Sequence, residues 1–288
     1  METKRIGINY PIYNPDEITV RKDLLYLQSC GFDCIELSLD SVPLIIGGEM
    51  NIHFAKYLEN ILYDMPFAYS AHSSGKLDLR SSAKISLHEK VLFSSIDVCQ
   101  RFGCSPLVIH FEEDSRISSV EREFLSIHAK AARYAAQCGV LLCIENIEVE
   151  RIDPVLEFIR KVNDANLQMT LDVGHAYLAS RYFGEDFLEV LSMAKPYIGH
   201  VHLSDNTGDF EETRISNREA YDAMPISSRI TFGQGDIHLP PFWGSIPYHD
   251  VFEILKGFPG KYICEFPANT FKPFLIETAQ DLRELIGL

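Results

Sequence analysis

The stretch IGHVHLSD, residues 198–205, contains the pattern that decides the fold: an apolar run that ends in a histidine, His202, and an acid, Asp205. Five further apolar runs end in a histidine, an aspartate or a glutamate: FAYSAH (67–72), PLVIHF (106–111), LLCIEN (141–146), QMTLDVGH (168–175) and KYICEF (261–266). Runs of this kind are typical of buried parallel strands. Polar groups at the carboxyl ends of six strands would gather at one rim of a barrel, and in a (β/α)8 barrel that rim is the catalytic face.

Strand-like and helix-like segments alternate along the whole chain, which predicts an α/β fold with one domain, a (β/α)8 TIM barrel over residues 1–288. RIGINY (5–10) and CIELSL (34–39) bring the number of strands to eight. Helices are expected after Pro15 and Asp16, over 51–62, 83–102 and 118–137, after Asp153 and Pro154, and over 185–194, 249–257 and 274–286, with a long loop over 206–247. A doubly wound sheet is the rival, but it usually has a glycine-rich loop after its first strand, and NYPIYNPDE contains no glycine.

Composition and charge narrow the classes of function. The chain has 288 residues, of which 46% are hydrophobic, and this is enough for the core of one large barrel. The formal net charge of −15 opposes the binding of polyanions, so nucleic acid is disfavoured as a partner. The N-terminal METKRIGINY has no apolar stretch of the length of a signal peptide or membrane helix, and the seven cysteines form no CxxC pair. We therefore expect reduced thiols, a cytoplasmic location and no membrane partner; a homodimer is compatible with a barrel of this size.

Four residues from successive strand ends, Glu145, Asp172, His202 and Glu265, form the main candidate metal site. Three carboxylates and one imidazole suit a divalent cation such as Mn, Mg, Co or Zn. Each residue alone would fit a salt bridge at the rim of a barrel. Several carboxylates that meet at one point repel each other, however, and this repulsion favours a bound cation.

The remaining histidines and acids leave alternatives open. His72 and His110 would bind either a second metal, together with Glu145, or the substrate. His175 is expected to reach a substrate oxygen from the loop after its strand. His200 points to the same face as His202 but lies deeper, and it could orient a metal ligand, as could Asp205.

Glu36 and Trp243 are weaker candidates for substrate contacts. Glu36, in IEL on the second strand, could close the ring of polar groups, but an ion pair with a neighbouring Lys or Arg is an equal alternative. Trp243, the only tryptophan, could stack on a sugar or could simply pack within its loop.

In its motifs the chain resembles the xylose isomerase-like barrel superfamily. The motifs are IEL (35–37), SAH (70–72), LVIH (107–110), CIEN (143–146), LDVGH (171–175), HVHLSD (200–205), GQG (233–235) and CEF (264–266). This superfamily includes sugar and sugar-phosphate isomerases and epimerases, inosose and dehydroshikimate dehydratases, and the endonuclease IV repair enzymes. In the epimerase branch the residues matching the four candidate ligands hold one metal. Those matching Glu145 and Glu265 also act as the acid/base pair, and the one matching His175 contacts sugar oxygens.

The chain departs from both branches that it resembles. The epimerases have an arginine shortly after the metal histidine, where this chain has residues 206–208, Asn-Thr-Gly. In the endonucleases a dinuclear centre uses the residues matching His72, His110, Glu145, Asp172, His202 and Glu265. A third metal there needs His175 and a DxH motif just before a glycine pair. With GQG (233–235) as that pair, Ser227 and Arg229 stand at the DxH positions, which predicts that the third site is missing; Asp236 and His238 have ligand-like spacing but lie in the expected loop.

The resemblance and the ligand pattern together predict a metal-dependent isomerase or epimerase of a small sugar, sugar phosphate or cyclitol. One carboxylate, Glu145 or Glu265, would take the proton next to the substrate carbonyl to give an enediolate, and the same or the opposite group would return it. A dehydratase would use the same enolate and expel a hydroxyl group. The alternatives of another class are an endonuclease IV-like phosphodiesterase acting on abasic sites and a barrel that only binds a sugar or a metal.

Overall fold

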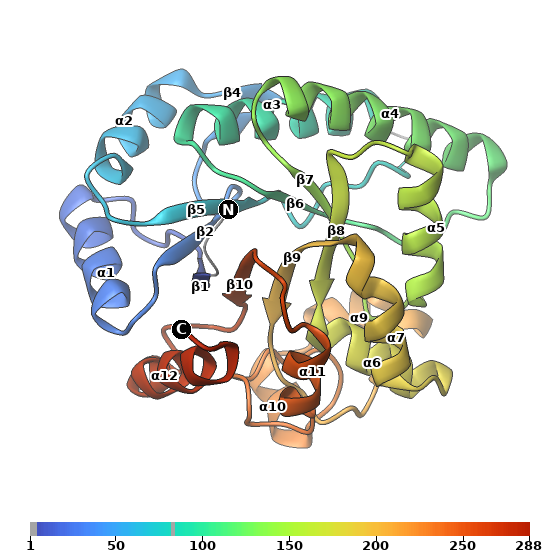
Figure 1. The fold of residues 1–288 in the computed structure, drawn as a ribbon. Coiled ribbons are helices and arrows are strands. Elements are labelled where there is room, and N and C mark those ends of the chain that lie inside the picture. Colours follow the sequence, from blue (N-terminus) through green and yellow to red (C-terminus); the bar gives the residue numbers. More distant parts are fainter. Residues whose placement is uncertain (1–4, 82–83) are drawn as a thin grey trace.

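The computed structural model describes residues 5–81 and 84–288, so the expected start of one helix at residue 83 lies outside the described residues. Eight parallel strands close into a barrel in the order β1-β10-β9-β8-β7-β6-β5-β2. Their bounds are β1 Arg5–Tyr10, β2 Cys34–Ser38, β5 Ala68–His72, β6 Leu107–His110, β7 Leu142–Glu145, β8 Leu167–Asp172, β9 Ile198–Leu203 and β10 Lys261–Cys264. The predicted TIM barrel and its eight strands are confirmed (Figure 1).

Helices surround the barrel and cover its outer face (Figure 1). They are α1 Glu17–Ser29, α2 Ile52–Leu62, α3 Ile85–Phe102, α4 Ser118–Gln137, α5 Ile152–Val162, α6 Val173–Phe183, α7 Phe187–Ala194, α11 Tyr248–Ile254 and α12 Leu275–Ile286, with short 3-10 helices at Lys195–Tyr197 and Lys272–Phe274. Asp16 caps α1 through a 3.1 Å hydrogen bond from the amide of Thr19. Gly103 ends α3 in the left-handed conformation, with φ 65°. Within the described residues, no helix is both long and apolar enough to cross a bilayer.

Three segments differ from the sequence prediction. A helix, α6, starts directly after β8, because the carboxylate of Asp172 accepts a 2.6 Å hydrogen bond from the amide of His175 and so caps it without an intervening turn. The predicted loop 206–247 contains three short helices, α8 Thr213–Ser216, α9 Arg218–Ala223 and α10 Ile226–Phe232. A small hairpin, β3 Ile45–Ile46 and β4 Glu49–Met50, lies between β2 and α2.

Strand register places the polar strand ends at one level. His110 pairs with Glu145 across β6 and β7, and Asp172 pairs with His202 across β8 and β9. Successive side chains of a strand point to opposite faces, so the fully buried Ile8, Ile144 and Val201, which adjoin the inward-facing Asn9, Glu145 and His202, pack on the outer face of the strands in the core shared with the helices. The polar groups are therefore held on a packed, rigid core at the carboxyl end of the barrel. All seven cysteines are free, and six of them are buried.

Candidate metal centre and active site

The central cluster consists of Glu145, Asp172, His202 and Glu265, and the structure brings one ligand atom of each within 4.8 Å of the others. Nδ1 of His202 lies 2.9 Å from Oε2 of Glu265, 3.5 Å from Oε1 of Glu145 and 3.9 Å from Oδ2 of Asp172. Glu145, Asp172 and His202 are buried, whereas the side chain of Glu265 is 19% exposed. The cluster therefore meets solvent at Glu265.

The donor atoms of the central cluster fit a bound cation. Glu145 Oε1, Asp172 Oδ2, His202 Nδ1 and Glu265 Oε2 are all buried; they lie within ion-pair distance of one another, but none makes a hydrogen bond of normal geometry to a described residue. Buried polar atoms normally have partners, so four unpartnered atoms that face one point are best satisfied by a shared metal ion. These would be the residues that hold a divalent metal.

A second cluster shares Glu145 with the first. Nε2 of His72 lies 3.2 Å and Nε2 of His110 lies 3.8 Å from Oε2 of Glu145, while Oε1 of the same carboxylate belongs to the central cluster. The rings of His72 and His110 are 4.9 Å apart. Glu145 is thus placed to bridge two cations, the arrangement that the sequence left open against substrate binding.

A third cluster joins His175 to Asp236 and His238, so ligands for a third site are present where the sequence analysis expected none. The sequence analysis looked for the DxH pair before GQG (233–235), whereas Asp236 and His238 follow it directly, after Gly233 has ended α10. The spacing of Asp236 and His238 was visible in the sequence, but only the fold shows that they return to His175.

The protonation of the third cluster is fixed by backbone carbonyls. Nδ1 of His175 lies 3.0 Å from the carbonyl oxygen of Asn146, and Nδ1 of His238 lies 2.6 Å from that of Glu265. Each Nδ1 therefore carries a hydrogen, and each Nε2 faces Oδ2 of Asp236, at 3.3 Å and 2.8 Å. Two Nε2 atoms that face one carboxylate require either a second proton on each ring, at Nε2, or a cation shared between the three groups.

The carboxylates shift the pKa values of the metal-free site. Burial raises the pKa of Asp172 to about 7, with help from Glu145 and Glu265 and against the charge of His175. Burial also opposes protonation of His72, but its hydrogen bond to Glu145 and the surrounding carboxylates outweigh burial and raise its pKa to about 9. The metal-free site therefore holds protons where a cation would otherwise bind.

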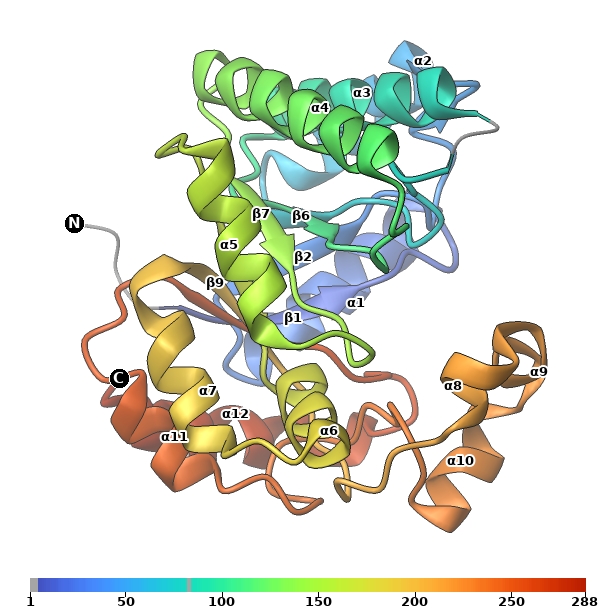
Figure 2. The ribbon, with the colours of Figure 1, turned by 90° about the vertical axis from the view of Figure 1, so that its right-hand side faces the viewer.

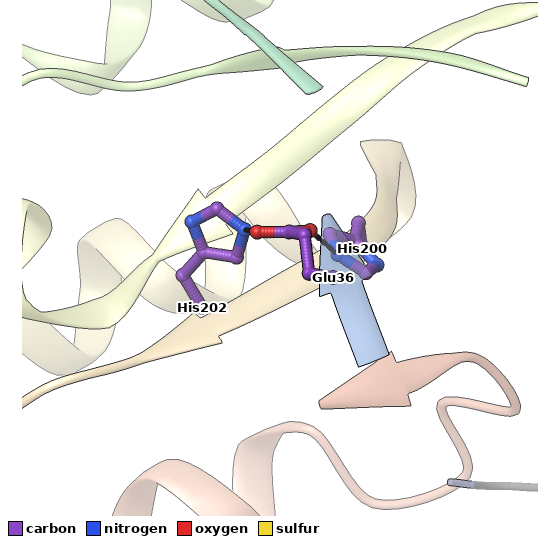
Figure 3. Close-up of side chains that lie close together, drawn as sticks. All are labelled: Glu36, His200 and His202. Carbon is purple, nitrogen blue, oxygen red and sulfur yellow. Dashed lines mark hydrogen bonds and ion pairs between the residues drawn. The ribbon is translucent and has the colours of Figure 1, made fainter. Parts of the chain in front are cut away.

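Glu36 lies beneath the central cluster and binds the two histidines of β9 (Figure 3). Its Oε2 is 2.8 Å from Nε2 of His200, and its Oε1 is 3.0 Å from Nε2 of His202. Asn9 and Ser70 add hydrogen bonds of 3.1 and 3.2 Å, and the carboxylate is completely buried. Glu36, which we predicted to contact substrate, instead holds Nε2 of His202 so that Nδ1 faces the metal cluster. His200 lies in the deeper position expected for it.

Two other candidates lie outside the clusters. Oδ1 of Asp205 accepts hydrogen bonds of 2.8 and 3.2 Å from the amides of Asn206 and Ile246. This carboxylate therefore anchors the connection after β9 and does not orient a metal ligand as expected. Trp243 is 48% exposed and packs on Phe271 and Phe274, with ring centroids 5.5 and 4.8 Å away. Its placement corresponds to packing within the loop.

A cavity of about 430 Å³ opens above the clusters. Its wall includes His72, His110, Glu145, His175, Asp236, His238 and Glu265 together with Arg214, Arg218, Tyr221 and Arg229. The last four residues come from the segment of α8 to α10, and the sequence analysis assigned none of them to the site. A cavity of this size accommodates a small polar molecule next to the candidate ligands.

Fold and site together define a TIM barrel with metal-type clusters at the carboxyl ends of its strands. The sequence model of the xylose isomerase-like TIM barrel family matches residues 24–286, and the chain belongs to this family. A search of curated proteins gave no match.

Solved structures similar to this chain cover nearly its whole length. A xylose isomerase-like TIM barrel protein from Mycobacterium smegmatis, in complex with magnesium, is 15% identical with a TM-score of 0.73 and covers 98% of this chain and 96% of its own. A D-allulose 3-epimerase from Methylomonas sp., in complex with D-allulose, is 15% identical with a TM-score of 0.68, covering 99% and 97%. A probable 3-DHS dehydratase from Bacillus anthracis is 15% identical with a TM-score of 0.69, covering 98% of each chain. At these identities the likeness supports the fold.

Proposed function

We propose that this protein is a divalent-metal-dependent isomerase or epimerase of a small sugar, sugar phosphate or cyclitol. The observation that carries the proposal is the convergence of four unpartnered ligand atoms, from Glu145, Asp172, His202 and Glu265, beside a cavity of about 430 Å³. A divalent cation bound there would polarise a substrate carbonyl and stabilise the negative charge of an enediolate. The cavity is polar enough for hydroxyl groups and has room for a molecule of sugar size.

Glu265 and Glu145 are the acid/base candidates, because both line the cavity and belong to the central cluster. Glu265 is the more exposed of the two, and its carboxylate can take the proton from the carbon next to the carbonyl. Glu145, or Glu265 itself, returns a proton to the enediolate on the other face or the neighbouring carbon. The histidines of the second and third clusters would hold substrate oxygens or further cations. Mn²⁺, Mg²⁺, Co²⁺ and Zn²⁺ all suit this mixed oxygen and nitrogen set.

A dehydratase would use the same first step and then lose the hydroxyl group beta to the carbonyl. Deuterium exchange separates these reactions. The metal-loaded protein is incubated in D₂O with a panel of ketoses, ketose phosphates and keto-cyclitols, and the products are followed by NMR. Deuterium at the carbon next to the carbonyl, with an altered sugar, supports the proposal, while loss of water indicates a dehydratase. Absence of exchange across the panel would contradict both.

The cluster of His175, Asp236 and His238 favours a second candidate, a phosphodiesterase that acts on abasic DNA. With three metal-type clusters around one cavity, the site has the ligands for a multinuclear hydrolytic centre. The net charge of −15 still opposes DNA binding. A cleavage assay on an abasic duplex with added zinc tests this candidate: cleavage that Asp236→Asn abolishes would support it and displace the isomerase proposal.

The free, mostly buried cysteines fit a reducing compartment and support the proposal of a cytoplasmic location.

A further inference from the structure

Residues 207–235, which contain α8 to α10 and are called here the α8–α10 segment, stand apart from the helices around the barrel (Figure 2). The segment leaves the rim after β9 and returns just before Asp236. Its two ends are joined by a bridge between Asp209 and Gln234 and by a 2.7 Å hydrogen bond from the amide of Gly235 to the carbonyl of Asp209. The two ends of the segment therefore lie side by side, and residues of the segment form one wall of the site cavity.

Three arginines of this segment line the cavity, but two of them are already neutralised. Arg214 is buried and forms ion pairs with Glu148 and, at 2.9 Å, with Glu113. Arg218 is bound to Asp222 at 2.9 Å. The charges of these two guanidinium groups hold the segment together and face carboxylates of the protein.

Arg229 is different, because it forms no ion pair with any carboxylate of the described residues. Its Nη1 donates to the hydroxyl of Tyr221 and, at 2.9 Å, to the carbonyl oxygen of Asp236. The guanidinium lies over the ring of Tyr221, 4.5 Å from its centroid, and its buried Nε has no hydrogen-bond partner. These contacts fix the guanidinium in place, but none of them is an ion pair with a carboxylate.

The position of Arg229 ties this charge to the reaction site. The residue it contacts, Asp236, has its own carboxylate 3.3 Å from His175 and 2.8 Å from His238. A group bound by Arg229 would therefore lie beside the third cluster, with the rest of the molecule extending over the cavity. A neutral sugar gives no reason for a fixed, unpaired cation in the wall of a cavity, whereas an anionic substituent does.

We propose that Arg229 binds an anionic substituent of the substrate, a phosphate ester or a carboxylate, so that the substrate is a sugar phosphate or a sugar acid rather than a neutral sugar. This inference rests on the proposed function, whose substrate class it narrows. The planar guanidinium suits either oxyanion. Of the three arginines that line the cavity, Arg229 is the one that forms no ion pair with a described carboxylate, so it is free to bind the anion.

Calorimetric titration of the metal-loaded protein with fructose, fructose 6-phosphate, gluconate and inorganic phosphate tests the proposal. We expect the wild type to bind one of the anionic sugars at least about tenfold more tightly than fructose, since a charge-assisted hydrogen bond contributes about tenfold to hundredfold. Arg229→Gln should remove most of that difference and leave the affinity for fructose unchanged. The anionic sugar that loses more affinity identifies the substituent.

Arg133→Gln provides a matched control, because it removes the same charge from an exposed position on α4. An unchanged preference for anionic sugars in Arg229→Gln would overturn the proposal, as would equal binding of neutral and anionic sugars by the wild type. The wild-type comparison decides the matter alone if Arg229→Gln does not fold. Proton exchange on neutral sugars, together with equal binding of neutral and anionic sugars, would leave the isomerase function standing without this subsite. Binding of inorganic phosphate that depends on Arg229, without binding of any sugar, would support the anion subsite and contradict the isomerase function.

Discussion

Two regions place side chains around the site cavity: the carboxyl ends of β7 to β10, and the connection between β9 and α11, residues 204–247. The two regions hold these side chains in different ways. Strand-borne Glu145 and Asp172 are set by register, opposite His110 and His202. In the connection, Asp236 and His238 depend on a few contacts, such as the bridge between Asp205 and Leu239. The strands therefore supply an array of ligands that follows from the barrel itself, whereas the connection adds groups that vary with the length and packing of one loop.

This difference makes Glu265 the most sensitive point, because it lies at the end of a strand and also faces the cavity. Glu265→Gln should lower turnover by about 10²- to 10⁴-fold, since a carboxamide cannot accept the substrate proton. The melting temperature of the metal-free protein should change little. Steady-state rates and thermal melts measure both effects, and Glu157→Gln on the exposed face of α5 is the control. Retained turnover would remove Glu265 from the chemistry.

The same comparison explains what could be predicted from the sequence. Apolar runs ending in Glu145, Asp172 and His202 identify the strands, and closure of the barrel alone brings their ends together. Asp236 and Arg229 carry no such signal, because their neighbours in space come from a connection with three short helices and no periodic pattern.

Strand positions also differ in what their residues do, as Glu36 illustrates. It was expected to face the substrate, but it lies two residues before the end of β2 (Cys34–Ser38), one layer deeper in the barrel than Ser38 in the cavity wall, and there it contacts His200 and His202. A single sequence gives the end of a strand more readily than the layer of the barrel in which a side chain lies.

Glu36→Gln tests whether a buried strand residue without substrate contact supports the central cluster. The amide can accept a hydrogen bond through only one of its two terminal atoms, so either His200 or His202 loses its acceptor. We expect the affinity for metal to fall about tenfold to hundredfold. In a metal titration, saturating metal should restore most of the turnover; a loss of turnover that saturating metal does not restore would instead indicate a direct role in the reaction.

Asp236→Asn asks the corresponding question of the connection between β9 and α11. Because Asp236 contributes only to the third cluster, this change should remove one bound metal equivalent or, if that cluster binds substrate, raise KM by about tenfold. The central cluster should keep its metal. Metal content by elemental analysis, measured beside Glu145→Gln, which affects two clusters, distinguishes the regions. Equal losses in both variants would show that strands and connection act as one centre.

The pH dependence of the melting temperature tests a histidine on a strand, His72, and a histidine in the connection, His238, in one experiment. In the metal-free protein the pKa of His72 is raised to about 9, and that of His238, where burial is outweighed by the charge of Asp236, to about 10. Both exceed the usual value of about 6.5, so the protonated rings stabilise the folded state fully below pH ~6.5, and this stabilisation is lost as pH rises through 9 to 10. The melting temperature of the metal-free protein should fall across this window. Because bound metal displaces those protons, stabilisation by metal should grow with pH; melting temperatures independent of pH in this range would contradict the assigned proton sites.

Substitution of Trp243 should give the smallest effect. It tests whether the connection contributes to the site beyond the residues that line the cavity. Its ring packs on Phe271 and Phe274 and does not line the cavity above the clusters. Trp243→Leu removes an edge-on aromatic contact worth about 0.5–1.5 kcal/mol, so the melting temperature should fall by a few degrees while kcat and KM stay within about twofold. Tyr221→Phe is the informative partner, because it removes a hydroxyl that contacts Arg229 in the wall of the site. A tenfold rise in KM for Trp243→Leu would mean that the loop closes over the substrate and that the functional part of the connection extends beyond the α8–α10 segment and the third cluster.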